Sequence, residues 1–193
     1  MLETVKYLMG TAGASGFSSK STAEQVTAVC PDLRPITAII TGATSGIGEE
    51  TARVLAMRGA RLVLPARNLK AAEETRSRIL SEFPHSDILV MGLDLSSLNS
   101  VRRFVADFQS LNLPLNLLFS YDHAISEDGV EMTFATNYLG HFLLTKLLLN
   151  KMMETAKTSG VQGRIVNVSS SIHSWFSGDT LRYLDLITKN KSS

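Results

Sequence analysis

The sequence is poor in the features that mark secreted, membrane-spanning and nucleic-acid-binding proteins. Its 193 residues hold one cysteine, Cys30, so no internal disulfide can form and a reducing compartment is expected. Lys and Arg number 19 against 18 Asp and Glu, and this net charge of +1 supplies no field for nucleic acid. The apolar run "FLLTKLLL" is interrupted by Lys146 and is far shorter than the roughly 20 residues of a membrane span. We therefore expect no nucleic-acid partner and no transmembrane segment.

Metal-ligand clusters are also missing. His141 and His173 have no His, Cys, Asp or Glu partners at the spacing of a metal site, so we interpret both as structural polar residues and predict no metal.

The first 20 residues are expected to form a flexible segment ahead of one domain over residues 21–193. "TAGASGFSSKS" is rich in Ser and Gly and holds no acid, which is typical both of organellar transit peptides and of disordered tails. The opening "MLETVKYLMG" lacks the apolar core of a secretory signal. The length suits one domain with a sizeable core.

Short apolar runs alternate with stretches of helical periodicity. The runs predict strands at 36–40, 62–64, 88–93, 115–119 and 164–168. A capping box at Ser21-Thr22-Ala23-Glu24 predicts a short helix through about Val29, and a long apolar helix is expected over 130–153. This alternation predicts an α/β fold with a doubly wound parallel sheet, the Rossmann arrangement.

The first predicted strand runs into a glycine-rich loop, "ITAIITGATSGIG". Glycine allows sharp turns and close approach of phosphate oxygens, and the following helix offers free N–H groups and a positive dipole. The alternative is a turn that only packs a helix against a strand, but the strand before and the helix after favour a phosphate site. We predict that the loop around Gly42, Gly46 and Gly48 binds pyrophosphate. The other loop residues predicted to bind the cofactor are Thr44, Ser45 and Ile47.

These residues match the fingerprint T-G-x-x-x-G-I-G, and further motifs agree with it: "ARN", "LDLSS", "FATNYLGHF" and "GRIVNVSSSIH". From about residue 21 to 175 the sequence resembles the short-chain dehydrogenase/reductase family. "SGFSSKSTAEQVT" and "FATNYLGHFLLT" are similar to a plant branch that includes a dehydrogenase associated with the chloroplast inner-envelope translocon, and more distantly to retinol dehydrogenases.

The resemblance implies an oxidoreductase that transfers hydride between NADP(H) and a carbonyl or alcohol substrate. It also implies a peripheral position at the chloroplast inner envelope, with a translocon or membrane-associated protein as a possible partner. A cytoplasmic location is the alternative.

Arg67 lies just after the second predicted strand, where an acid would select NAD and a cation accommodates the 2′-phosphate of NADP. Asn68 follows it as a second candidate. We favour NADP because a guanidinium matches phosphate geometry, although a solvated arginine at a helix start is the alternative. Asp94, with Leu95 beside it, resembles the family acid that meets the adenine amino group, and Asp94 could also cap the next helix.

Ser170 and Asn137 match the family's catalytic serine and its proton-relay asparagine. The family tyrosine and lysine of Y-x-x-x-K have no counterpart, since Tyr183 and Lys189 lie six residues apart and would face opposite sides of a helix. Phe119-Ser120-Tyr121-Asp122 stands where the family has N-N-A-G.

We therefore expect a truncated Rossmann domain that is incomplete at its C-terminal end and catalytically impaired. The alternative is a non-catalytic, NADP(H)-responsive partner of a membrane or translocon assembly.

Overall fold

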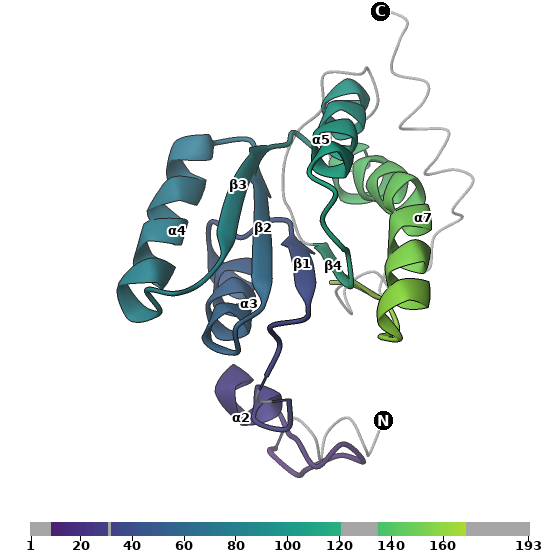
Figure 1. The fold of residues 1–193 in the computed structure, drawn as a ribbon. Helices are drawn as coiled ribbons and strands as arrows, with labels where there is room; N and C mark the ends of the chain where they lie inside the picture. The colour runs from purple at the N-terminus through teal and green to yellow at the C-terminus, as the bar shows by residue number, and fades with distance from the viewer. Residues whose placement is uncertain (1–8, 31, 121–134, 169–193) are drawn as a thin grey trace, which may run out of the picture.

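The computed structural model describes residues 9–30, 32–120 and 135–168 (Figure 1). In chain order its elements are α2 (Ala23–Thr27), β1 (Thr37–Ile40), α3 (Gly46–Met57), β2 (Arg61–Ala66), α4 (Leu69–Glu82), β3 (Ile88–Gly92), α5 (Leu98–Ser110), β4 (Leu117–Ser120), η1 (Ala135–Gly140), α7 (His141–Ser159) and β5 (Arg164–Asn167). Each predicted strand is present within two residues of its expected bounds.

The strands form one sheet in the order β3-β2-β1-β4-β5, with every neighbouring pair parallel. In register, Ile39 of β1 lies between Val63 of β2 and Leu118 of β4. The chain therefore starts in the middle of the sheet, builds outward to β3, and then crosses back to place β4 on the other side of β1. This confirms the predicted doubly wound sheet, whose strand order reverses between β1 and β4.

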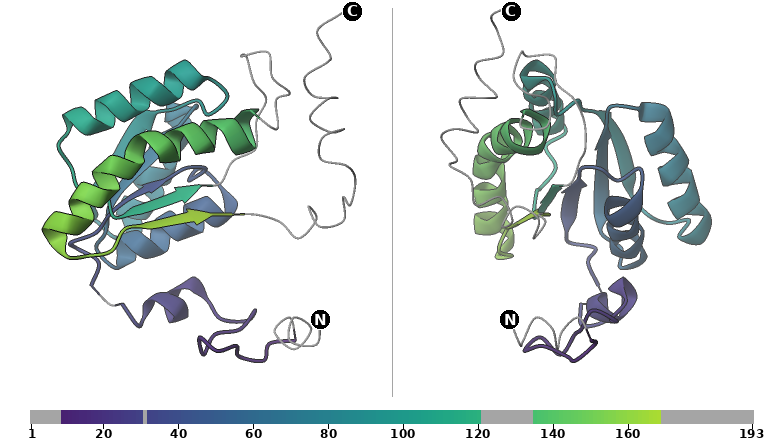
Figure 2. Two further views of the ribbon diagram at one scale, coloured as in Figure 1. Left: turned by 90° about the vertical axis from the view of Figure 1, so that its right-hand side faces the viewer. Right: turned by 180° about the vertical axis from the view of Figure 1, so that it is seen from behind.

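Helices cover both faces of the sheet. Successive strand residues point to opposite faces, and each face contributes buried apolar side chains to a core with these helices. Figure 2 shows α5 and α7 in front of the sheet and α3 behind it. Ile39 and Val63 pack with Phe104 of α5 and Leu144 of α7, all buried. The intervening residues pack on the other face with α3 and α4, in a second core that includes Ala38, Ile40, Leu62, Leu64, Ala52 and Ile79. No described helix is both long and apolar enough to cross a membrane.

The capping box before α2 lies one residue later than the sequence pattern indicated. Thr22 Oγ1 accepts a hydrogen bond from Gln25 N, and Gln25 Oε1 accepts one from Thr22 N. Two overlapping S/T-x-x-E/Q patterns were available. The carboxylate of Glu24 instead pairs with Arg53 of α3, so Gln25 completes the box.

Arg53 joins three helices through their carboxylates. It pairs with Glu24 of α2, with Glu50 of its own helix at 2.8 Å and with Glu82 of α4 at 3.3 Å. The hydrogen bond from Arg53 is the main cause that lowers the pKa of Glu50, whereas the pKa of Glu24 is lowered first by its own backbone N–H and then by Arg53. Arg58 adds a hydrogen bond to the carbonyl oxygen of Glu24, so α2 is held against α3 by two arginines.

The long predicted helix differs at both ends from the expectation of 130–153. Residues 130–134 lie outside the described part of the chain, and the first described turns form a π-helix, η1, before α7 begins at His141. α7 continues to Ser159 and ends at Gly160, which takes a left-handed conformation with φ 70°. Thr155 lies in this extra stretch, and its buried hydroxyl accepts a hydrogen bond from Leu115 N at 2.9 Å. The helix is thus longer than its apolar pattern predicted, and the added stretch is joined by this bond to the chain before β4.

Candidate cofactor site

The predicted site residues follow the carboxyl ends of the strands, and parallel strands place these ends at one edge of the sheet. The glycine loop follows β1, Arg67 follows β2 and Asp94 lies two residues after β3. Thr41 N donates to Phe119 O at 3.0 Å, so the loop leaves the sheet between β1 and β4. In open α/β sheets, ligands bind at such a reversal of strand order. The edge therefore brings together the segments that the sequence proposed for a dinucleotide.

The three glycines of the loop have different physical roles. Gly42 and Gly46 have φ of 64° and 55°, a left-handed conformation that side chains disfavour. Gly48 is required by contact, because a Cβ there would lie 2.3 Å from Gly42 O. A Cβ on Gly46 would instead meet no atom within 4 Å. The loop is thus tightly packed at Gly48 and open at Gly46, as a cradle for a ligand requires.

The N-terminus of α3 faces this open side without a side-chain cap. Ser45 occupies the N-cap position and its hydroxyl accepts no capping hydrogen bond. Ser45, Gly46 and Ile47 are exposed, the last at 53%, and Thr44 is half-buried. Glu49 in the first turn pairs with Arg78 of α4 at 2.7 Å. Uncapped N–H groups and the positive helix end are the features that bind phosphate.

Arg67 lies exposed at the end of β2 and forms no ion pair with any residue that the structure describes. Arg53, Arg76 and Arg78 nearby along the chain all pair with carboxylates. Asn68 is the N-cap of α4, where Oδ1 accepts from Ala71 N at 3.2 Å. The first turn of α4 contains no acid. This end of β2 therefore presents a positive charge with no internal partner.

Asp94 does not cap the following helix, so that alternative is wrong. Ser97 is the N-cap of α5, and the Oδ1 atom of Asp94 instead accepts from Ser96 N at 2.9 Å and Ser96 Oγ at 2.6 Å. Leu95 is buried, and its carbonyl oxygen lies 2.2 Å from where a Cβ on Gly140 would be. The side chain of Leu95 thus belongs to the core.

Asn137 lies in η1 with its side chain exposed. Ser170, Tyr183 and Lys189 lie outside the described residues, as do Tyr121 and Asp122 of the segment that replaces N-N-A-G. The sequence did not predict that Ser120, at the end of β4, pairs with His141, the first residue of α7. The only local signals were a small polar residue closing an apolar strand and a histidine after Gly140.

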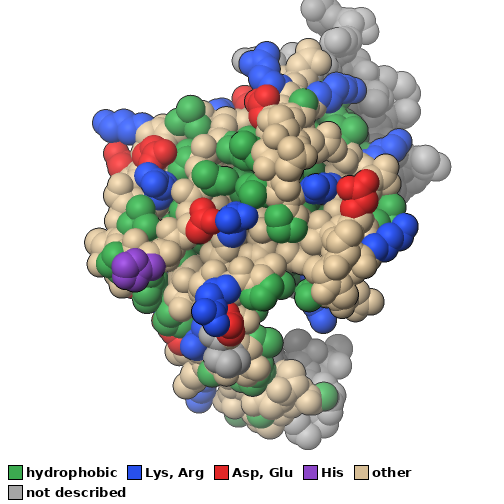
Figure 3. Space-filling model, in the orientation of Figure 1, with side chains coloured by type: hydrophobic (Ala, Val, Ile, Leu, Met, Phe, Trp, Pro, Cys, Tyr) green, Lys and Arg blue, Asp and Glu red, His purple; other side chains and the backbone are tan. Residues whose placement is uncertain are grey.

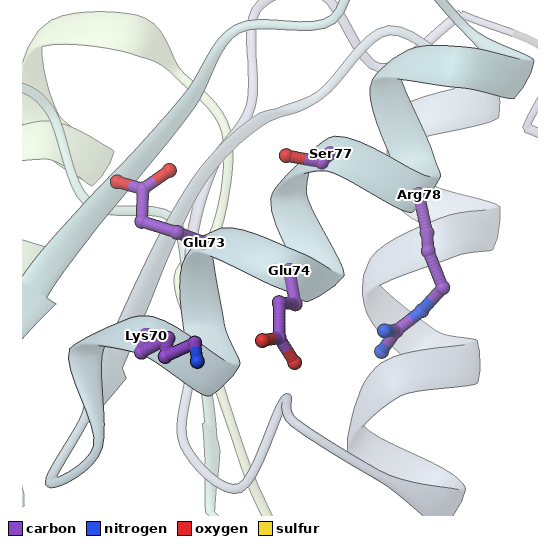
Figure 4. A pocket seen from close by; sticks show the side chains of 5 residues that line it. All are labelled: Lys70, Glu73, Glu74, Ser77 and Arg78. Carbon is purple, nitrogen blue, oxygen red and sulfur yellow. The ribbon is translucent and has the colours of Figure 1, made fainter.

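A shallow groove is lined by five α4 side chains, Lys70, Glu73, Glu74, Ser77 and Arg78 (Figure 4). The charged side chains of this groove are of both signs. In the view of Figure 3, charged and apolar side chains are interspersed over the surface. Within the described ranges, no three His, Cys, Asp or Glu residues gather as a metal site.

A parallel sheet with a glycine loop between its first strand and helix defines a Rossmann domain of the dinucleotide-binding class. Residues 36–176 match the family model for short chain dehydrogenases. The chain belongs to the short-chain dehydrogenase family.

Three comparisons place it further. The chain is 51% identical over 180 residues to short-chain dehydrogenase TIC 32 B, chloroplastic, from Brassica napus, which covers 90% of this chain and 56% of the relative. It is 41% identical over 141 residues to mouse retinol dehydrogenase 12. This match covers 70% of this chain and 43% of the relative. Among solved structures, an alcohol dehydrogenase from Thermococcus sibiricus complexed with 5-hydroxy-NADP is 25% identical and superposes with a TM-score of 0.53. This match covers 63% of this chain and 55% of the other. The chain therefore spans about half the length of the curated relatives it matches.

Proposed function

We propose that this chain forms the cofactor-binding part of an NADP-dependent oxidoreductase that transfers hydride between NADP(H) and a carbonyl or alcohol substrate. One observation carries the proposal: the open, uncapped glycine loop lies at the same sheet edge as Arg67, a cation that forms no ion pair with the residues the structure describes. The similarity to the alcohol dehydrogenase complexed with 5-hydroxy-NADP supports this cofactor type.

In this proposal the loop residues Gly42 to Gly48 bind the pyrophosphate through backbone N–H groups. Asp94 keeps one carboxylate oxygen, Oδ2, that is not used in the contacts with Ser96 and is free to accept from the adenine amino group. Arg67 pairs with the 2′-phosphate, and Asn68 offers its side-chain amide beside it. When bound, NADPH supplies the hydride; Asn137 and Ser170 orient water and the carbonyl oxygen.

The test is a titration of wild type and Arg67→Asp with NADPH and NADH. We expect wild type to prefer NADPH and the variant to lose that preference, since an acid repels the 2′-phosphate and can accept from ribose hydroxyls. Arg164→Asp makes the same charge change at the opposite edge of the sheet, where β5 begins, and should leave both affinities unchanged. Equal affinities in wild type would disprove the choice of NADP.

We also propose that the 193-residue polypeptide is impaired in catalysis. No tyrosine in the sequence is followed by lysine four residues later, and a positioned acid or base contributes typically 10²–10⁴-fold. Carbonyl reduction by this polypeptide should be compared with that of a form extended by a segment containing Y-x-x-x-K. Equal rates would show that another group, with Tyr183 as the first candidate, delivers the proton.

A second candidate function is that of a nucleotide-responsive partner protein in the chloroplast. It is favoured by an intact phosphate loop in a sequence without Y-x-x-x-K, and by similarity to chloroplastic relatives. A translocon or other membrane-associated assembly of the inner envelope would be the partner. The test is pull-down from envelope membranes with and without NADPH. Capture that does not change with NADPH would contradict a responsive role.

A further inference from the structure

A buried hydrogen bond joins the end of β4 to the start of α7. Ser120 Oγ lies 2.9 Å from His141 Nδ1, and the two residues are 4% and 9% exposed. Polar groups removed from water need partners, so this contact is built into the core between sheet and helix. Neither residue was among those predicted for the site.

The serine end of this bond is fixed by the sheet. Ser120 pairs in register with Asn167 of β5, and its carbonyl oxygen accepts from Val168 N at 3.1 Å. The preceding residue, Phe119, pairs with Ile40 of β1. Ser120 is therefore held by backbone hydrogen bonds of the central sheet and cannot easily follow a shift of the helix.

The histidine end lies at the junction between η1 and α7. Immediately before it, Gly140 packs so closely on the loop after β3 that a Cβ there would lie 2.2 Å from Leu95 O. The junction is thus held from two directions, by backbone contact with Leu95 and by the side-chain bond to Ser120. Together these contacts resist rotation of the η1 backbone.

Asn137 lies four residues before His141 within η1. A π-helical turn is a local departure from the regular helix that is frequent at functional sites. The side chain of Asn137 is exposed, so packing does not hold it and its direction depends on the backbone of η1. We propose that Ser120 and His141 are positioning residues that set the direction in which η1 presents Asn137. The inference rests on the proposed function, in which Asn137 belongs to the reaction site.

The experiment records the side-chain and backbone amide resonances of Asn137 by ¹⁵N–¹H NMR. Ser120→Ala removes the hydroxyl, and Ser120→Thr keeps it. Thr155→Val is the matched control, because it removes another buried hydroxyl bond between the sheet layer and the same helix, near its far end. We expect Ser120→Ala to displace the Asn137 resonances, Ser120→Thr to restore them, and Thr155→Val to leave them in place although it also lowers the melting temperature.

Unchanged Asn137 resonances in Ser120→Ala, or an equal displacement in Thr155→Val, would overturn the proposal. Should Ser120→Ala fail to fold, Ser120→Cys preserves the volume with a weaker hydrogen-bonding group and is judged by the same resonances. A parallel NADPH titration of wild type tests the proposed cofactor separately from the positioning role of Ser120 and His141. Failure of wild type to bind NADPH would count against the proposed function, while the resonances would still decide whether Ser120 and His141 position Asn137.

Discussion

Gly48 and Gly42 approach each other so closely that a β-carbon on Gly48 would lie 2.3 Å from the Gly42 carbonyl oxygen. The first turn of α3 is therefore packed directly on the loop that leads into it. We predict that Gly48→Ala destabilises the fold by about 1–3 kcal/mol, the usual effect of overpacking, and weakens NADPH binding. Urea unfolding and a cofactor titration measure the two effects. Gly92→Ala, where a Cβ meets nothing within 4 Å, should change neither by much.

Alanine variants of Gly46 and Gly160 distinguish a glycine needed for backbone conformation from one that also leaves space for a ligand. Gly46 and Gly160 both have positive φ and open surroundings, so alanine at either position should lower stability by a similar amount, about 1–2 kcal/mol. Only Gly46→Ala should also weaken NADPH binding, because its methyl group enters the proposed phosphate path. Calorimetric titration of both variants decides this. Equal cofactor affinity in the two would mean that the loop is only a turn.

Asn68 allows the helix-capping role to be separated from cofactor contact. Asn68→Ala removes the N-cap of α4 and should lower stability by about 1 kcal/mol. Asn68→Asp keeps a capping oxygen, so stability should be retained while the added negative charge beside Arg67 weakens NADPH binding. Ser97→Ala removes the cap of α5 in the same way and serves as the control. If Asn68→Asp bound NADPH as well as wild type does, the 2′-phosphate would not lie near this residue.

The Arg53 cluster should make stability depend on pH in a defined window. The pKa values of Glu24 and Glu50 are lowered below their ordinary 4.5 in the folded chain. The unfolded chain therefore binds protons first as the pH falls, so the contribution is complete above about pH 5 and is lost on acidification through the folded pKa values. Melting temperatures measured from pH 6 to pH 3 should fall less steeply in Arg53→Gln than in wild type.

Arg102→Gln is the control for this pH dependence, since it also removes one positive charge, but from an exposed arginine that forms no ion pair with any described residue. Its slope should match that of wild type. Hydrogen exchange gives an independent measurement, in which the backbone amides of α2 exchange faster in Arg53→Gln. Identical slopes in Arg53→Gln and wild type would show that α2 is held by other contacts.

Periodicity predicted those parts of the fold where burial repeats strictly along the chain. Leu98, Val101, Phe104, Val105 and Phe108 recur at helical intervals in the sequence, and all but the half-buried Leu98 are buried in α5. The strands β1, β2 and β4 were found for a related reason, since they are mainly buried and strands covered on both faces become continuous apolar runs. The glycine loop could be predicted from the sequence because left-handed turns and close backbone contacts both favour glycine. The roles assigned to individual site residues stay predictions.

Features set by distant residues were not predictable. The π-turn in η1 has no sequence signature of its own, and α7 extends to Ser159 partly because Thr155 meets Leu115. The capping box lies one residue later than the sequence predicted, and the carboxylate of Glu24 pairs with Arg53, which lies 29 residues away. The Ser120–His141 bond likewise joins two segments that only the folded sheet brings together.

The placement of β4 beside β1 has a kinetic consequence. Thr37 and Asn116, whose backbone and side chain bond across the start of these strands, are 79 residues apart in the chain. β1, β2 and β3 with their helices can pair through much shorter connections, whereas closing β4 onto β1 must overcome the entropy of this long loop. Refolding should therefore show early protection of amides in β1 to β3 and later protection in β4 and β5. Because the glycine loop leaves the sheet between β1 and β4, the proposed cofactor edge would be completed only in that later step, and NADPH would bind only after the slow phase of folding.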